Sequence, residues 1–171
     1  DALSKSEATV WVSTPSFAEM CLSDKKFAQA LLPKLKAFLF CGEILTNSTA
    51  LKLIDRFPQA EIINTYGPTE STVAVTEQKI TKELADKDKP LPIGKAKNGT
   101  FIEIWDETGK PCAIDQTGEI VIIGDTVAAG YFNNNEATLK AFLTVNKNGI
   151  QHKAYKSGDR GFCDRSGILH Y

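Results

Sequence analysis

The sequence predicts an α/β fold that is followed by a smaller, β-rich region, and three observations carry this prediction. Residues 35–41 form an almost continuous apolar run of strand length, which is typical of a parallel strand covered on both faces. Apolar residues then recur with a period near 3.6 between residues 46 and 57, and a second short apolar run follows at 60–63. Alternation of strands and helices indicates a parallel sheet with right-handed crossovers, whereas strand and turn patterns dominate after residue 90.

The first elements are short. Residues 9–12 alternate weakly between polar and apolar side chains, which predicts a strand. Pro15 or Ser16 suits the first turn of the helix that follows, because the backbone amide of that turn has no partner within the helix. Asp24 predicts the cap of a second short helix, whose apolar residues lie between 27 and 32 and which a proline ends.

The helix between the two apolar runs has clear boundary signals. Gly42 breaks the first run, and Thr46 or Asn47 supplies a helix cap. Pro58 stops the helix, and the strand at 60–63 follows directly. The order so far is therefore strand, helix, strand, helix, strand.

The character of the chain changes after residue 70. Residues 77–89 are charged and predict a loop-like insertion, whereas 101–105 and 118–124 predict strands. Only residues 136–143 predict a helix, with an asparagine as its cap, and residues 155–160 predict a turn. We therefore place one boundary near residues 80–92, which divides an α/β lobe (1–85) from a β-rich lobe (86–171).

Composition excludes several classes of protein. The formal net charge of −1 and the absence of a basic stripe argue against nucleic-acid binding, and 42% hydrophobic with 24% charged residues is ordinary for a globular protein. The apolar runs are too short to cross a bilayer, so no membrane insertion is expected. The cysteines are too widely spaced for a zinc site or a disulfide framework, so we expect reduced thiols and a cytoplasmic protein; they are Cys21, Cys41, Cys112 and Cys163.

Residues 64–70, which read Asn-Thr-Tyr-Gly-Pro-Thr-Glu, follow the predicted strand at 60–63. They supply an amide, an aromatic face, a hydroxyl and a carboxylate at the carboxyl end of a strand, where open α/β sheets bind ligands. By local chemistry alone, a structural Gly-Pro turn is an equally good interpretation. Three weaker motifs follow: Leu-Pro-Ile-Gly at 91–94, Gly-Glu-Ile-Val-Ile-Ile-Gly at 118–124 with Gly-Tyr-Phe at 130–132, and Tyr-Lys-Ser-Gly-Asp at 155–159.

In this order and spacing, the motifs resemble those of the adenylate-forming enzymes, which are acyl-CoA synthetases, luciferases and the adenylation domains of peptide synthetases. The resemblance covers essentially the whole chain. It implies the large N-terminal domain of such an enzyme, with a parallel-sheet α/β subdomain and a smaller β-rich subdomain built as a distorted barrel. Residues 11–22, 38–43 and 64–76 further resemble the ligases of this family that activate D-alanine with ATP and load it onto the phosphopantetheine thiol of a carrier protein, for teichoic acids of the cell envelope.

This resemblance implies ATP and Mg²⁺ as cofactors and assigns roles to single residues. Asn64 is implied at the adenine edge and Tyr66 on the adenine face, a role that suits an aromatic ring. Thr69 is implied at the α-phosphate, Glu70 at Mg²⁺, which prefers oxygen ligands, and Asp159 at both ribose hydroxyls. The implied nucleotide set consists of Gly42, Glu43, Asn64, Thr65, Tyr66, Gly67, Thr69 and Asp159.

The residues after the first apolar run are implied to form the opposite wall of the adenine site. Gly42 would admit the flat base because it has no side chain, with Glu43 beside it. Cys41 is implied against the methyl group of D-alanine, with Gly67 and Val73 nearby. A cysteine at a strand end is, however, usually a small buried hydrophobe, so packing alone also explains Cys41.

Other parts of such an enzyme are missing from these residues. The family's phosphate loop, its aspartate for the substrate amine and its C-terminal lysine have no match, so we expect an internal piece of a longer enzyme that is inactive alone. Ala129 stands where many members have arginine, and Ser157, where threonine is commoner, keeps the hydroxyl. Two alternatives stay open: an adenylation domain or acyl-CoA synthetase for another acid, and a non-catalytic nucleotide-binding or carrier-docking module.

Overall fold

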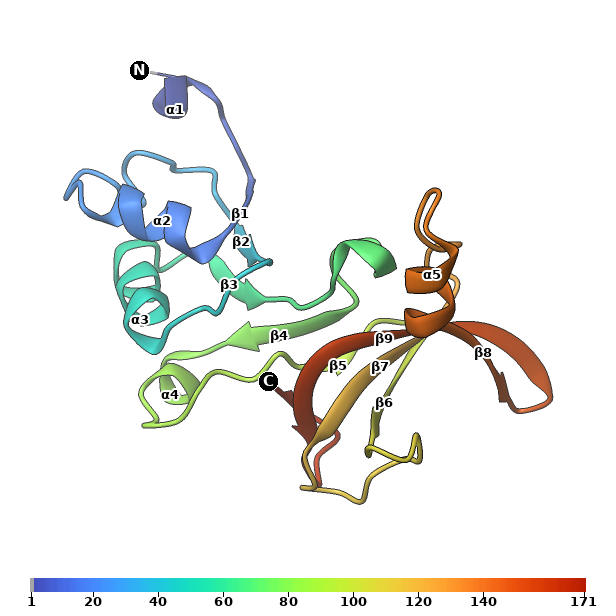
Figure 1. Ribbon diagram of the computed structural model, residues 1–171. Coiled ribbons are helices and arrows are strands. Elements are labelled where there is room, and N and C mark those ends of the chain that lie inside the picture. The colour runs from blue at the N-terminus through green and yellow to red at the C-terminus, as the bar shows by residue number, and fades with distance from the viewer. Residues whose placement is uncertain (1) are drawn as a thin grey trace. The chain divides into compact units, whose positions relative to one another are not determined.

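The computed structural model in Figure 1 describes residues 2–171 and divides them into two units. The first unit runs to Thr65 and resumes at Gln78–Leu91, and the second comprises Tyr66–Glu77 and Pro92–Tyr171. The chain therefore passes from one unit to the other three times, whereas the sequence predicts a single boundary after residue 85.

Three parallel strands form the centre of the first unit, as the sequence predicts. These are β1 (Val10–Ser13), β2 (Ala37–Phe40) and β3 (Glu61–Asn64), paired in the order β1-β2-β3. Residues 78–80 of β4 (Thr76–Ile80) then pair antiparallel with β3, so the sheet is mixed. The loop predicted for residues 77–89 is wrong, because this segment contains β4 and the short helix α4 (Lys82–Ala85), capped by the Thr81 side chain.

Helices α1 (Ala2–Lys5), α2 (Pro15–Leu22) and α3 (Asn47–Arg56) belong to the same unit. The predicted cap of α3 is confirmed, since the Thr46 side chain accepts a hydrogen bond from the Thr49 amide. Leu53 of α3 is fully buried in one cluster with Phe38, Phe40 and Phe57. Burial of these side chains stabilises the unit, because apolar surface removed from water contributes about 25 cal/mol per Å².

The second short helix predicted for residues 24–32 is wrong, because this segment forms turns. The Asp24 carbonyl accepts from the Phe27 amide at 3.1 Å and from the Arg56 guanidinium at 2.9 Å. The Gln29 amide donates to the Arg56 carbonyl at 2.8 Å. Bonds to the end of α3 thus occupy backbone groups that a helix would have used.

The second unit is mainly an antiparallel sheet. Its strands pair in the order β10-β9-β7-β6, with β8 on β9, so β9 (Ile150–Cys163) pairs with three other strands. Within residues 2–171 this path is open and does not close into a barrel. The other strands are β5 (Lys95–Ala96, on the start of β4), β6 (Thr100–Trp105), β7 (Gly118–Gly124), β8 (Phe142–Lys147) and β10 (Leu169–His170).

Two details of the second unit differ from the sequence prediction. The helix α5 (Asn135–Ala141) ends before the predicted residue 143, because Phe142 begins β8 and pairs with Tyr155. The turn predicted at 155–160 is wrong, because these residues lie within β9. Their glycine instead marks a bulge, as described below. A single turn of 3₁₀ helix, η1 (Thr69–Ser71), lies between β3 and β4.

Candidate nucleotide site

The carboxyl ends of the three parallel strands meet at one edge of the first unit's sheet. Ser13, Phe40 and Asn64 are direct partners in the strand register and are the last residues of β1, β2 and β3. The Cys41 amide continues the pairing with a 3.4 Å bond to the Ser13 carbonyl. The site residues predicted in this unit therefore lie at or just beyond the strand ends, at the edge where open α/β sheets bind ligands.

Asn64 and Thr65 are both buried at this edge. The Thr65 amide and hydroxyl each donate to the Phe40 carbonyl at 2.8 Å. These two bonds tie the end of β3 to β2 and explain why a hydroxyl residue stands here. The side chain of Thr65 is thus a structural element of the strand end.

Gly42 and Glu43 are exposed beyond the end of β2. Gly42 has a φ of +88°, a left-handed conformation that favours glycine. The Glu43 carboxylate accepts from the Ser16 amide at 3.1 Å, in the first turn of α2. A negative group at a helix N-terminus satisfies an amide that lacks a partner within the helix, so Glu43 has a structural role there.

In the second unit, residues 66–76 form a loop closed at its base. The Tyr66 carbonyl accepts from the amides of Val75 and Thr76, at 2.8 and 3.1 Å, and the Tyr66 amide donates to the Thr76 hydroxyl at 3.1 Å. A Cβ added to Gly67 would lie 2.0 Å from the Val73 carbonyl oxygen. Val73 itself has a φ of +69°, which is an outlier for a β-branched residue. The glycine is therefore required by close approach of two backbone segments.

Glu70 lies within η1, next to Thr69, which is exposed. The Tyr131 hydroxyl donates to the Glu70 carboxylate at 2.7 Å, and this bond is the main cause that lowers the pKa of Glu70. The same bond raises the pKa of Tyr131. The Ala128 amide also donates to the Glu70 carbonyl at 2.8 Å. Glu70 is thus an ionised carboxylate held from both its side chain and its backbone.

Asp159 accepts a 2.7 Å hydrogen bond from the Tyr66 hydroxyl, across 93 residues of sequence. Burial is the first cause that raises the pKa of Tyr66, and Asp159 raises it further. The Asp159 charge is also the main cause that raises the pKa of Tyr171, whose ring centroid lies 5.8 Å from that of Tyr66. Two neutral phenols therefore face one carboxylate in this unit.

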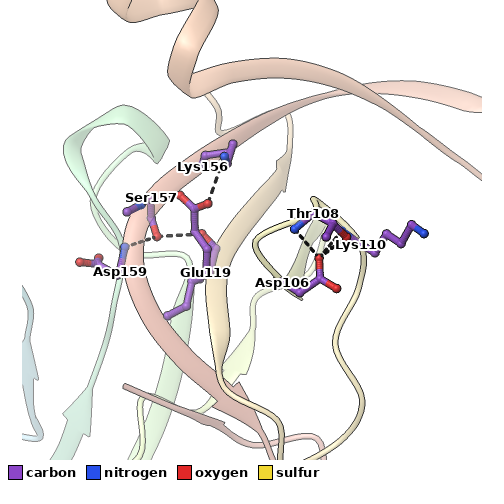
Figure 2. A network of polar contacts seen from close by, with 9 residues as sticks. Asp106, Thr108, Lys110, Glu119, Lys156, Ser157 and Asp159 are labelled. Atoms are coloured by element: carbon purple, nitrogen blue, oxygen red, sulfur yellow. Dashed lines mark hydrogen bonds and ion pairs between the residues drawn. The ribbon is translucent and has the colours of Figure 1, made fainter.

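Asp159 stands on a bulge of β9, shown in Figure 2. Glu119 of β7 pairs with Arg160, and Val121 pairs with Lys156, so residues 157–159 stand opposite the single residue Ile120. Bulges of this kind re-aim side chains and are frequent beside active sites. The bulge therefore turns the Asp159 side chain out of the regular alternation of the strand.

The donor chemistry of these residues fits ATP with Mg²⁺. Tyr66 donates to one oxygen of Asp159, and a carboxylate has about four acceptor positions, which leaves capacity for two ribose hydroxyls. No group of three or more metal-ligating side chains occurs among residues 2–171. Mg²⁺ usually takes one or two carboxylates plus phosphate oxygens, so the single carboxylate of Glu70 suits it.

Some predicted neighbours are brought together and others belong to different units. Tyr66 with Asp159, and Gly67 with Val73, contact each other within the second unit. Cys41, implied beside Gly67 and Val73, belongs to the first unit, so its pocket role stays a proposal. The role of Tyr131 was missed, because its contact with Glu70 spans 61 residues, although the Gly-Tyr-Phe motif marked its position.

The described cysteines carry thiols without disulfides, and no helix in residues 2–171 is long and apolar enough to cross a membrane.

Polar strand ends at the carboxyl edge of a parallel sheet are typical of nucleotide-binding α/β proteins. The chain belongs to the AMP-binding enzyme family, whose model matches residues 1–132. This agrees with the adenylate-forming resemblance of the sequence motifs.

Three relatives define the likeness more closely. The D-alanine–D-alanyl carrier protein ligase of Bacillus anthracis is 48% identical over 170 residues, which are 99% of this chain and 33% of that protein. The structure of PA1221, a peptide-synthetase protein with adenylation and carrier domains, matches 95% of this chain and 28% of its own, with a TM-score of 0.85 and 32% identity. The Vibrio cholerae adenylation domain AlmE, in complex with glycyl-adenosine-5′-phosphate, matches 98% of this chain and 31% of its own, with a TM-score of 0.80 and 29% identity. The chain thus spans about a third of the length of these proteins.

Proposed function

We propose that the chain is the nucleotide-holding part of a cytoplasmic ligase that activates D-alanine with ATP. The product, D-alanyl-AMP, passes its alanyl group to the phosphopantetheine thiol of a carrier protein, for D-alanylation of teichoic acids. The 48% identity to a D-alanine–D-alanyl carrier protein ligase, sustained over 170 residues, carries this proposal. It applies to the whole enzyme, of which these residues supply binding groups.

In the first step, a carboxylate oxygen of D-alanine attacks the α-phosphorus of ATP, and the bond to the pyrophosphate oxygen breaks. Such a step needs positioning and charge neutralisation more than covalent help from the protein. Mg²⁺ would neutralise phosphate charge when it is bound to Glu70. The thiol of the carrier protein then attacks the carbonyl carbon of D-alanyl-AMP, and AMP leaves.

The second unit supplies the groups with the clearest geometry. Asp159 accepts the ribose hydroxyls beside the Tyr66 hydroxyl that already bonds to it. The Tyr66 ring stacks on adenine, and the exposed Thr69 hydroxyl bonds the α-phosphate. Glu70 would hold the metal, because the Tyr131 bond lowers the pKa of its carboxyl and so favours the ionised form.

The first unit supplies the strand-end residues. Asn64 bonds the adenine edge, with Thr65 fixing the strand end behind it. Gly42 and Glu43 line the adenine site, and the left-handed turn at Gly42 follows directly after Cys41. In this proposal the Cys41 side chain packs on the methyl group of D-alanine, with Gly67 and Val73 contributing to the same pocket.

The test is D-alanine-dependent exchange between ATP and pyrophosphate. The chain is assayed alone and as a chimera, in which it replaces the aligned third of the B. anthracis ligase. We expect no exchange from the chain alone, because the phosphate loop and the lysine are not among its residues, and exchange from the chimera with D-alanine preferred over L-alanine. Glycine belongs in the panel because AlmE was solved with glycyl-adenosine-5′-phosphate. A chimera that exchanges with glycine or L-alanine as well as with D-alanine contradicts the proposed substrate. Exchange by the chain alone contradicts the proposal that these residues supply binding groups without catalysing the reaction.

A further inference from the structure

The bulge that carries Asp159 has lost regular strand pairing, so its backbone groups need other partners. The Ser157 hydroxyl donates to the Ile120 carbonyl at 2.7 Å and accepts from the Asp159 amide at 3.1 Å. The Gly158 amide donates to the Glu119 carboxylate at 3.0 Å. Two side chains, those of Ser157 and Glu119, therefore bind backbone groups at the bulge.

Glu119 is the only one of these partners that reaches the bulge from the neighbouring strand with a charged side chain, as Figure 2 shows. One oxygen of its carboxylate binds the Gly158 amide, and the other lies 3.2 Å from the Lys156 ammonium. Its side chain is 26% exposed, so the pair is partly shielded from water. A hydrogen bond with an ionised acceptor is about twice as strong as a neutral one.

The bond from the Gly158 amide to Glu119 matters for the conformation of the bulge, because Gly158 has a φ of +77° and no side chain that could fix it. Glycine has the largest conformational freedom of any residue, so an unanchored Gly158 would let the next residue, Asp159, change direction. The Tyr66 hydroxyl holds Asp159 from the other side at 2.7 Å. Glu119 and Tyr66 thus fix the carboxylate from its backbone and from its side chain.

We infer that Glu119 is a positioning residue, which aims Asp159 at the ribose of the nucleotide by anchoring the Gly158 amide. This inference rests on the proposed function of Asp159. It assigns a role in positioning the nucleotide to the glutamate of the Gly-Glu-Ile motif, whose sequence pattern predicts a strand but no role for this side chain.

The test compares ATP with 2′,3′-dideoxy-ATP, which lacks both ribose hydroxyls, in the chimera described above. We expect Glu119→Ala to raise the KM for ATP at least fivefold and to leave the KM for dideoxy-ATP within twofold. Glu119→Gln keeps an oxygen acceptor and is expected to restore most of the preference. Lys156→Met is the matched control, because it removes the second partner of Glu119 and leaves the bond to Gly158.

A second measurement uses the chain itself and needs no nucleotide. We expect Glu119→Ala to speed amide hydrogen exchange at Gly158 and Asp159 at least tenfold, and Lys156→Met to leave it within threefold. Unchanged exchange in Glu119→Ala overturns the inference. An equal rise in KM for ATP and dideoxy-ATP also overturns it, because a general loss of structure then explains the effect.

Asp159→Asn separates this inference from the proposed function. If Asp159→Asn abolishes the preference for ATP and Glu119→Ala does not change it, Asp159 binds ribose and the positioning role is wrong. If Asp159→Asn leaves the preference intact, the proposed ribose role itself is wrong, and the inference fails with it.

Discussion

Replacing Gly67 with alanine is the most direct test of the loop that carries Glu70. The added Cβ would lie 2.0 Å from the Val73 carbonyl oxygen, 2.8 Å from the Val73 carbonyl carbon and 2.9 Å from the Val75 nitrogen. All three are backbone atoms, so no side-chain rotation can relieve the clash. The two backbone segments must separate.

Separation breaks the base of the loop. The bonds from the Val75 and Thr76 amides to the Tyr66 carbonyl, at 2.8 and 3.1 Å, are the contacts at risk. Each such bond contributes about 0.5–1.5 kcal/mol, and overpacking adds about 1–3 kcal/mol. We therefore expect Gly67→Ala to lower the free energy of unfolding by about 3 kcal/mol.

Urea unfolding followed by circular dichroism measures this change, and thermal unfolding gives a second value. A loss of about 3 kcal/mol corresponds to a drop in Tm of roughly 6–12 °C for a chain of this size. Gly109→Ala is the control, since Gly109 has a φ of +78° but nothing lies within 4 Å of an added Cβ. The control introduces backbone strain without a clash, about 1–2 kcal/mol, whereas Gly67 is not among the glycines with positive φ and Gly67→Ala introduces the clash without that strain. Equal losses in the two variants, or a loss below 1 kcal/mol for Gly67→Ala, would refute the argument from close approach.

Three further predictions follow from single contacts. Tyr131→Phe removes the bond that lowers the pKa of Glu70. A carboxyl whose pKa is lowered in the folded state stabilises the fold above its unfolded pKa, and this stabilisation is lost as the pH falls through the folded pKa. The variant should therefore show a higher Glu70 pKa by NMR titration and a smaller loss of stability between pH 7 and pH values below that pKa. Asp159→Asn should weaken ATP binding about tenfold or more in the chimera, because a hydrogen bond to a charged group contributes about 1.5–3 kcal/mol, and an unchanged affinity in titration calorimetry would contradict this. Leu53→Ala should cost about 2–5 kcal/mol in urea unfolding, because Leu53 is 0% exposed, whereas Leu139→Ala, at a side chain 82% exposed, should stay within about 0.5 kcal/mol.

The elements that sequence predicts well are those with local signals. The strands now seen as β2, β3, β6 and β7 all follow from apolar runs, and α3 follows from its cap and its period. β4 was missed because its exposed positions are charged, and only Ile80 and Thr76 mark its buried face. The helix predicted after Asp24 failed because its backbone groups bind the end of α3, a tertiary effect that no local pattern encodes.

In the candidate site too, local sequence signals predict the position of a motif but not its contacts with distant residues. The motif at 64–70 lies where a strand-end argument places it, since β3 ends at Asn64. The bond between Tyr66 and Asp159 and that between Glu70 and Tyr131 span 93 and 61 residues, so composition and spacing cannot predict them. The bulge at Asp159 was interpreted as a turn, because a glycine between polar residues is typical of both.

The central place of β9 has a consequence for how the protein is made. On the ribosome, the first unit has its last residue, Leu91, long before β9 is synthesised. Because β9 pairs with β7, β8 and β10, the antiparallel sheet can be completed only after residues 150–163 have emerged. Until then Tyr66 lacks Asp159 as a partner and β7 has an unpaired edge, so the nascent chain presents an open strand that chaperones or neighbouring chains can bind.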